Sequence, residues 1–138
     1  MIKDRSNKAM RIPLMLNKPQ RSPLELSSIK LYSTGSRGKV FTDRFYKSMN
    51  HNFGVQVTIL NNTNTIQNAK IHGCVYNSGD SQIIEWKSNK KLNAKSESSF
   101  DFYVKEENFE KLKNGKYKVK FWINDKKVMQ KFFEVTYK

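Results

Sequence analysis

The chain has 138 residues and a mass of 16.2 kDa, so it holds one compact domain at most, with a short tail. Apolar residues make up 37% of it and aromatic residues 12%, which is enough for a two-layer core. Lys and Arg number 26 against 12 Asp and Glu, and the resulting charge of +14 favours solubility and attraction to polyanions without indicating a fold.

The first 23 residues, Met1 to Pro23, have the composition of a linker. They are basic, contain all three prolines and show no sustained hydrophobic period. Each proline also disfavours a helical conformation of the residue before it. We therefore expect a basic, extended arm over residues 1–23 and one folded domain over residues 24–138.

From Leu24 onward, β-branched and aromatic runs recur roughly every eight to twelve positions between clusters of Asn, Gly, Ser and Asp, which predicts an antiparallel all-β domain. The expected strands, in chain order, are Leu26–Tyr32, Lys39–Tyr46, Asn52–Leu60, Ala69–Tyr76, Gln82–Lys87, Ser98–Val104, Lys116–Ile123 and Lys127–Tyr137. The polar stretch Ser88–Glu97 is expected to be a loop. Lys105–Leu112 is expected to form a turn or two of helix that Gly115 can end.

The last two expected strands alternate most clearly between apolar and polar residues. In Lys116–Ile123 the odd positions are apolar and face the core, and in Lys127–Tyr137 we expect Phe133, Val135 and Tyr137 to do the same. A bulge near Met129–Lys131 is expected to adjust the phase of the final strand. The full expected core is Phe45, Phe53, Val55, Val57, Ile59, Ile71, Val75, Phe100, Phe102, Tyr117, Val119, Phe121, Phe133 and Val135.

The segment Leu112-x-x-Gly115-x-Tyr117-x-Val119 resembles the tyrosine corner that opens strand F of immunoglobulin-like sandwiches, where the tyrosine hydroxyl folds back onto the preceding loop. Val119 stands where antibody domains have a disulfide cysteine, so the resemblance is to the disulfide-free bacterial and fibronectin-like branch. The tryptophan of strand C is missing, because Trp86 falls one strand later. This difference argues against an antibody-type binding surface.

A broader resemblance covers most of residues 28–138. The order Ile29–Tyr32, Phe45, Phe53–Ile59, Tyr117-x-Val119 and Phe133-x-Val135 is similar to an accessory β-sandwich domain at the carboxyl end of multidomain bacterial proteins. It implies an immunoglobulin-like antiparallel β-sandwich of seven or eight strands, with one short helical turn before the penultimate strand. It also implies a non-enzymatic binding or spacer module attached to an upstream domain, with no common ligand.

Residues that could carry catalysis or bind a metal are sparse. His72-x-Cys74 is the sole potential ligand pair, and zinc wants about four ligands, which this chain could complete only with distant Asp or Glu. Cys74 is interpreted as a small core residue. The acidic residues form no pair in an apolar frame of the kind that serves acid catalysis. We therefore expect no catalytic residues, no metal, no cofactor and no enzymatic activity.

A basic stripe is the main candidate for a binding surface. It combines the polar face of Lys116–Ile123 with two lysines of the final strand, and its members are Lys116, Lys118, Lys120, Trp122, Lys127 and Lys131. Three interpretations remain open. The stripe is a surface for an acidic protein partner, which we favour as the function; or it binds nucleic acid together with the basic N-terminal arm, with a base stacked on Trp122; or it is an ordinary solvated sheet face.

Cysteine content and hydropathy bear on the compartment. Cys74 is the single cysteine, which rules out an intrachain disulfide, and no apolar run reaches the length needed to span a bilayer. These features predict no membrane contact and a reducing compartment, the cytoplasm. They leave the oligomeric state open.

Overall fold

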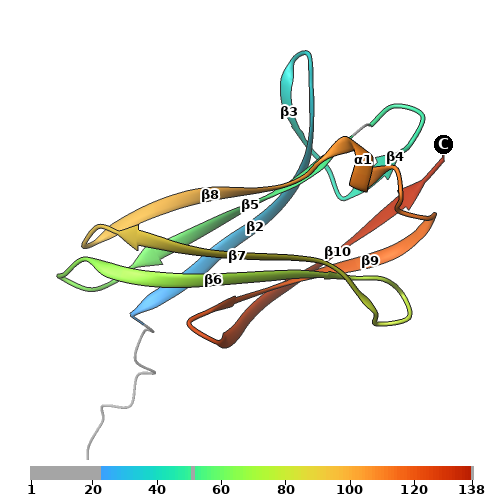
Figure 1. Ribbon diagram of the computed structural model, residues 1–138. Helices are drawn as coiled ribbons and strands as arrows, with labels where there is room; N and C mark the ends of the chain where they lie inside the picture. The colour runs from blue at the N-terminus through green and yellow to red at the C-terminus, as the bar shows by residue number, and fades with distance from the viewer. Residues whose placement is uncertain (1–22, 51, 138) are drawn as a thin grey trace, which may run out of the picture.

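The computed structural model describes residues 23–50 and 52–137, where nine strands and one short helix form two sheets packed face to face (Figure 1). The elements are β2 (Leu24–Gly35), β3 (Gly38–Phe41), β4 (Arg44–Tyr46), β5 (Phe53–Asn61), β6 (Gln67–Tyr76), β7 (Gln82–Leu92), β8 (Ser96–Val104), α1 (Glu106–Phe109), β9 (Gly115–Ile123) and β10 (Lys126–Thr136). Residues 1–22 of the expected arm lie outside the described residues. No helix in the described part is long and apolar enough to cross a membrane.

The two sheets confirm the predicted antiparallel β-sandwich, with nine strands in the described residues where seven or eight were expected. The five-stranded sheet has the order β4-β10-β9-β6-β7, and the four-stranded sheet has the order β3-β2-β5-β8. Neighbouring strands are antiparallel except for β4, which pairs with β10 in parallel. β7 and β8 are edge strands of the two sheets, and they lie next to each other on the same side of the sandwich. β7 pairs with β6, and β8 pairs with β5.

The core lies between the sheets and is built from alternate residues of nearly every strand. Every expected core residue is buried except Phe100, which packs against the rim of the core. Tyr137 was expected to face inward but is 61% exposed, because β10 ends at Thr136 and the chain has left the sheet. Phe109 of α1 is buried against Phe45 and Phe53, so the predicted helical turn closes one end of the sandwich.

Two expected boundaries are wrong. Lys39–Tyr46 is two strands in different sheets, because the chain bends at Thr42, whose hydroxyl accepts a hydrogen bond from the Arg44 amide at 3.1 Å. Ser88–Glu97 is no loop, because β7 continues to Leu92 and β8 begins at Ser96. Backbone pairing with β6 holds this Lys- and Asn-rich segment in the sheet despite its low strand propensity.

The bulge and the tyrosine corner are both present. The register of β10 shifts between Lys127 and Met129, at the start of the expected bulge segment. The Tyr117 hydroxyl donates a hydrogen bond to the backbone carbonyl oxygen of Lys113 at 2.5 Å, four residues back along the chain. Burial raises the pKa of Tyr117, so the hydroxyl keeps the proton that it donates.

Gly73 provides a test of the packing inside the five-stranded sheet. A Cβ at this position would lie 2.4 Å from the Phe121 ring, so we expect Gly73→Ala to lower the free energy of unfolding by about 1–3 kcal/mol. Gly79→Ala is the matched control, since its Cβ would meet nothing closer than 3.4 Å, and it should change stability by less than about 0.5 kcal/mol. Urea unfolding followed by circular dichroism measures both, and equal stabilities for the two variants would contradict the packing.

Candidate functional site

The face of the five-stranded sheet that points away from the core carries most of the expected basic stripe. Cross-strand partners project from the same face, and the register places His72 and Lys127 on either side of Trp122, with Tyr76 beside Lys118. We call this surface the outer face. Its residues are His72, Cys74 and Tyr76 of β6, Glu85 and Lys87 of β7, Lys116, Lys118, Lys120 and Trp122 of β9, and Lys127, Gln130, Phe132 and Glu134 of β10.

Lys131 does not belong to the outer face. It pairs with Val119, which is buried in the core, and its Nζ lies 3.4 Å from the carbonyl oxygen of Ile29 in the opposite sheet. The reason is the period of two from Phe133, which turns Lys131 inward. Phe132 points outward instead, opposite Lys118, and is 61% exposed. Phe132 was not among the residues expected on this surface, although the same alternation contained the signal.

The lysines at the centre of the outer face are held in place by their neighbours. Lys118 Nζ lies 2.7 Å from a carboxylate oxygen of Asp80, and its hydrogen bond and charge lower the pKa of that exposed carboxyl. Lys118 and Lys120 lie over the Tyr76 ring, with Nζ at 5.9 Å and 5.1 Å from its centroid. The basic surface is therefore ordered at its centre.

A cluster of His72, Cys74 and Glu85 lies beside these lysines. His72 Nε2 is 2.6 Å from Glu85 Oε2 and 3.3 Å from Cys74 Sγ. Within the described part of the chain it is the one group of three His, Cys or acidic side chains close enough together to hold a metal ion. The His72 ring stacks on Trp122, with ring centroids 5.0 Å apart and planes 26° apart, and this contact fixes the imidazole.

Cys74 is small and buried, as the sequence suggested, but it is not part of the core cluster between the sheets. It is buried, with 1% exposure, but it projects to the outer face beneath polar side chains, and Gly73 takes the core-facing position beside it. Burial raises the pKa of the Cys74 thiol, and Glu85 adds to that effect, while Tyr76 and nearby lysines oppose it. Glu85 is the acidic partner that the sequence could not place, because its position depends on the register of the β6–β7 hairpin.

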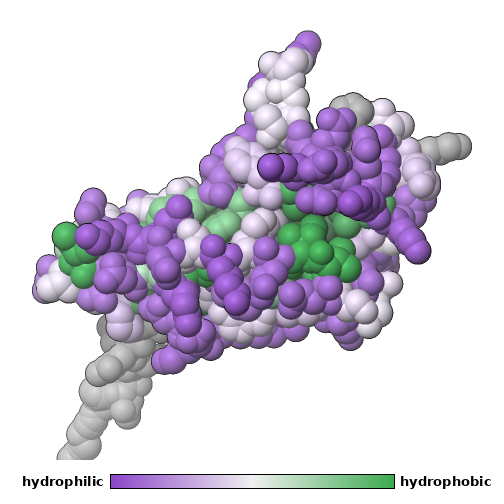
Figure 2. Space-filling view, in the orientation of Figure 1, coloured by the Kyte–Doolittle hydropathy of each residue, from purple (hydrophilic) through white to green (hydrophobic). Residues whose placement is uncertain are grey.

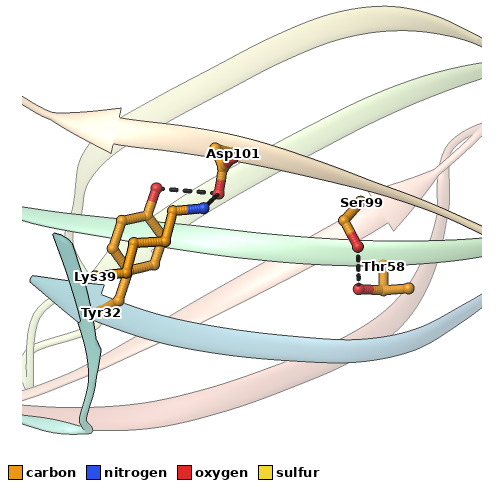
Figure 3. Close-up of polar contacts among 5 residues, drawn as sticks. All are labelled: Tyr32, Lys39, Thr58, Ser99 and Asp101. Atoms are coloured by element: carbon orange, nitrogen blue, oxygen red, sulfur yellow. Dashed lines mark hydrogen bonds and ion pairs between the residues drawn. The ribbon is translucent and has the colours of Figure 1, made fainter. Parts of the chain in front are cut away.

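The outward side of the four-stranded sheet has polar groups that pair with one another (Figure 3). Tyr32 lies across Gly54, and its hydroxyl donates to Asp101 at 3.1 Å. Lys39 Nζ lies 4.8 Å from the Tyr32 ring centroid and 2.9 Å from the same carboxylate. The hydroxyls of Thr58 and Ser99 form a pair at 2.8 Å. The polar groups at the centre of this side therefore satisfy one another.

Figure 2 shows hydrophobic patches between the two sheets, the largest of them below α1. An open hollow of about 750 Å³ lies between residues 77–85 and 108–117. Its lining includes Ile83, which is 39% exposed, together with Ile84, Leu112 and several lysines. The hollow is a shallow apolar and basic groove next to the outer face.

Comparison with known proteins supports the fold. No protein-family model and no curated protein sequence matches the chain. A Pseudomonas fluorescens alkylpurine DNA glycosylase (AlkC), solved bound to DNA with an abasic-site analogue, superposes with a TM-score of 0.61 and 10% identity over 83% of this chain and 31% of the glycosylase chain. A glycoside hydrolase family 2 β-glucuronidase gives a TM-score of 0.56 and 9% identity, over 83% of this chain and 12% of that enzyme.

One smaller solved protein is covered by the match over nearly its whole length. An immunoglobulin-like protein from Pseudomonas aeruginosa superposes over 83% of this chain and 97% of its own length, with a TM-score of 0.49 and 10% identity. The chain spans less than a third of the glycosylase and about an eighth of the glucuronidase. The fold is an antiparallel β-sandwich of two sheets that carries the tyrosine corner of immunoglobulin-like domains.

The burial of Cys74 predicts slow chemistry at its thiol. A raised pKa leaves little thiolate, so we expect iodoacetamide to modify native Cys74 at least about tenfold more slowly than the same chain unfolded in urea. Ser81→Cys in a Cys74→Ser background is the exposed control and should react at about the same rate folded and unfolded. Equal native and unfolded rates for Cys74 would contradict its place beneath the outer face.

Proposed function

We propose that this domain is a non-catalytic interaction module whose outer face binds an acidic protein surface. The observation that carries the proposal is Phe132, a large aromatic side chain that is 61% exposed among lysines of a sheet face. Aromatic residues that are exposed in the free protein and covered by a partner supply much of the energy of protein interfaces. Phe132 is therefore proposed as the anchor, with the lysines forming its rim.

The charge of the outer face supports an acidic partner. Its defined residues include five lysines and two glutamates. Both glutamates already have partners: Glu134 lies 3.1 Å from Arg44, and Glu85 lies 2.6 Å from His72. A basic surface whose acidic groups are paired attracts anionic groups, and this complementarity sets specificity and association rate more than affinity.

Two features favour a protein over nucleic acid. The cations among the defined outer-face residues are lysines, and Arg44, the arginine beside them, lies 3.1 Å from Glu134. Bidentate recognition of phosphates and guanine is an arginine property. One face of Trp122 is covered by His72, so that ring is less open to a stacked base than the sequence suggested. The DNA in the AlkC structure is bound by that glycosylase. Binding of nucleic acid by this chain is an alternative to the proposed function, and the experiment below distinguishes the two.

An accessory role is consistent with the comparisons. Domains of this fold form a minor part of two larger enzymes, at 31% and 12% of their chains. The basic residues 1–23 are proposed to act as the arm that connects residues 24–138 to a neighbouring domain or partner. In such an arrangement the sandwich contributes recognition and positioning, and chemistry belongs to another module.

Binding of a labelled peptide of Glu and Leu, compared with a labelled oligothymidine, tests the proposal by fluorescence anisotropy. We expect the peptide to bind the unmodified chain. The double variant Lys120→Glu/Lys127→Glu should bind the peptide at least about tenfold more weakly, because it reverses two charges on the outer face. Phe132→Ala should weaken peptide binding by a similar factor, because the anchor is lost.

Lys105→Glu with Lys111→Glu is the matched control, with the same change in net charge at exposed positions around α1. It should leave peptide affinity within about twofold, since it leaves the outer face unchanged. An equal loss in this control would show attraction to net charge alone and contradict the proposed surface. The result would favour nucleic acid instead if oligothymidine binds more tightly than the peptide, if its affinity falls steeply with salt, and if Phe132→Ala leaves that affinity unchanged.

A further inference from the structure

We propose that His72, Cys74 and Glu85 form a binding site for one zinc ion, with an open coordination position facing solvent. No metal was expected from the sequence, because His72 and Cys74 lacked further ligands. The structure supplies Glu85 from the neighbouring strand and places the three donor atoms within 4.8 Å of one another. The site is independent of whatever binds at Phe132.

The backbone presents these donors on one rigid hairpin. His72 and Cys74 are two residues apart on β6 and therefore share a face, and Glu85 of β7 pairs directly with Cys74. The turn that joins the strands is fixed by the Asn77 side chain, whose oxygen accepts hydrogen bonds from the amides of Gly79 and Ser81 at 2.9 Å and 3.0 Å. The donor set is thus held by sheet register rather than by a mobile loop.

The mixture of donors fits zinc better than other common ions. One imidazole nitrogen, one thiolate sulfur and one carboxylate oxygen are the ligand types that zinc takes, whereas calcium and magnesium prefer oxygen alone. Zinc bonds of about 2.0–2.3 Å place tetrahedral ligand atoms roughly 3.3–3.6 Å apart. The 3.3 Å between Cys74 Sγ and His72 Nε2 already matches. The Glu85 carboxylate would draw back from 2.6 Å to His72, and its separation from Cys74 Sγ is within 4.8 Å.

The surroundings orient the ligands and leave the ion accessible. Stacking on Trp122 fixes the His72 ring, and the side chains of His72 and Glu85 remain 29% and 39% exposed. Gln82 Oε1 lies 3.5 Å from Cys74 Sγ, beside the thiol. Three protein ligands leave a fourth position for water or for a donor from a partner, as in zinc sites that are not closed.

The charges also balance. Binding releases the thiol proton of Cys74 to solvent and uses the lone pair of His72 Nε2, which leaves the imidazole proton on Nδ1. Zinc with one thiolate and one carboxylate is then electrically neutral. Burial raises the pKa of the free Cys74 thiol, and the charges of Lys87 and Lys120 on either side oppose that effect. The two lysines meet no net positive charge once the neutral complex has formed.

Cobalt and zinc titration of the reduced full chain tests the site. Co²⁺ alone should give, at one equivalent, the sulfur-to-metal charge-transfer band and the visible bands of a tetrahedral thiolate site, and Zn²⁺ should displace it. Cys74→Ser should abolish the charge-transfer band. Removal of a residue that only hydrogen-bonds to a metal ligand weakens metal binding about 10- to 100-fold. Removal of a ligand itself should therefore lower zinc affinity at least tenfold in His72→Gln and in Glu85→Gln, as measured by competition with a chromophoric chelator.

Two matched controls and a readout without substitution complete the test. His51→Gln and Glu107→Gln remove the chain's other histidine and an exposed acid of α1, and they should leave zinc affinity unchanged. In the unmodified chain, one equivalent of Zn²⁺ should protect Cys74 from alkylation. The proposal is overturned if the unmodified chain shows no thiolate band and no protection, or if both His72→Gln and Glu85→Gln fold and bind zinc as tightly as the parent.

Discussion

Contact among Gly73, Phe121 and Trp86 fixes the arrangement of the five-stranded sheet. Phe121 and Trp86 flank Gly73 from the neighbouring strands, with ring centroids 6.1 Å apart and planes 6° apart. A Cβ on Gly73 would lie 2.4 Å from Phe121, so only glycine lets these rings close over β6. Side chains alternate along a strand, so an inward-facing Gly73 places its neighbours His72 and Cys74 on the outer face of β6. In the same way, the inward-facing Phe121 places Lys120 and Trp122 on the outer face of β9.

The outer face therefore holds two neighbouring functions in these proposals. Phe132 and its lysines lie towards β10, where an acidic protein would bind, and the His72, Cys74 and Glu85 cluster lies towards β7. The intervening strand β9 carries Lys120 over Tyr76 and Trp122 against His72, so it contacts both regions. The outward side of the four-stranded sheet differs, since Tyr32, Lys39 and Asp101 bond to one another.

Local patterns in the sequence predicted what depends on alternation and on one motif. The alternation of β9 placed Lys116, Lys118 and Lys120 outward, and the Tyr117 corner indicated the immunoglobulin-like fold. The features that the sequence did not predict depend on pairing between segments that are distant in the chain. The bend at Thr42 follows from β4 joining β10, the extension of β7 follows from β6, and the place of Glu85 follows from hairpin register. Lys131 was misplaced although the period of two from Phe133 already turned it inward.

A ¹H–¹⁵N correlation spectrum recorded during titration with the Glu and Leu peptide tests most directly that the outer face is the binding surface. We expect shift changes to concentrate on the amides of β9 and β10, around Lys118, Lys120 and Phe132, with β2, β5 and β8 unchanged. Changes centred on β2, β5 and β8, or spread evenly over all lysines, would contradict the account.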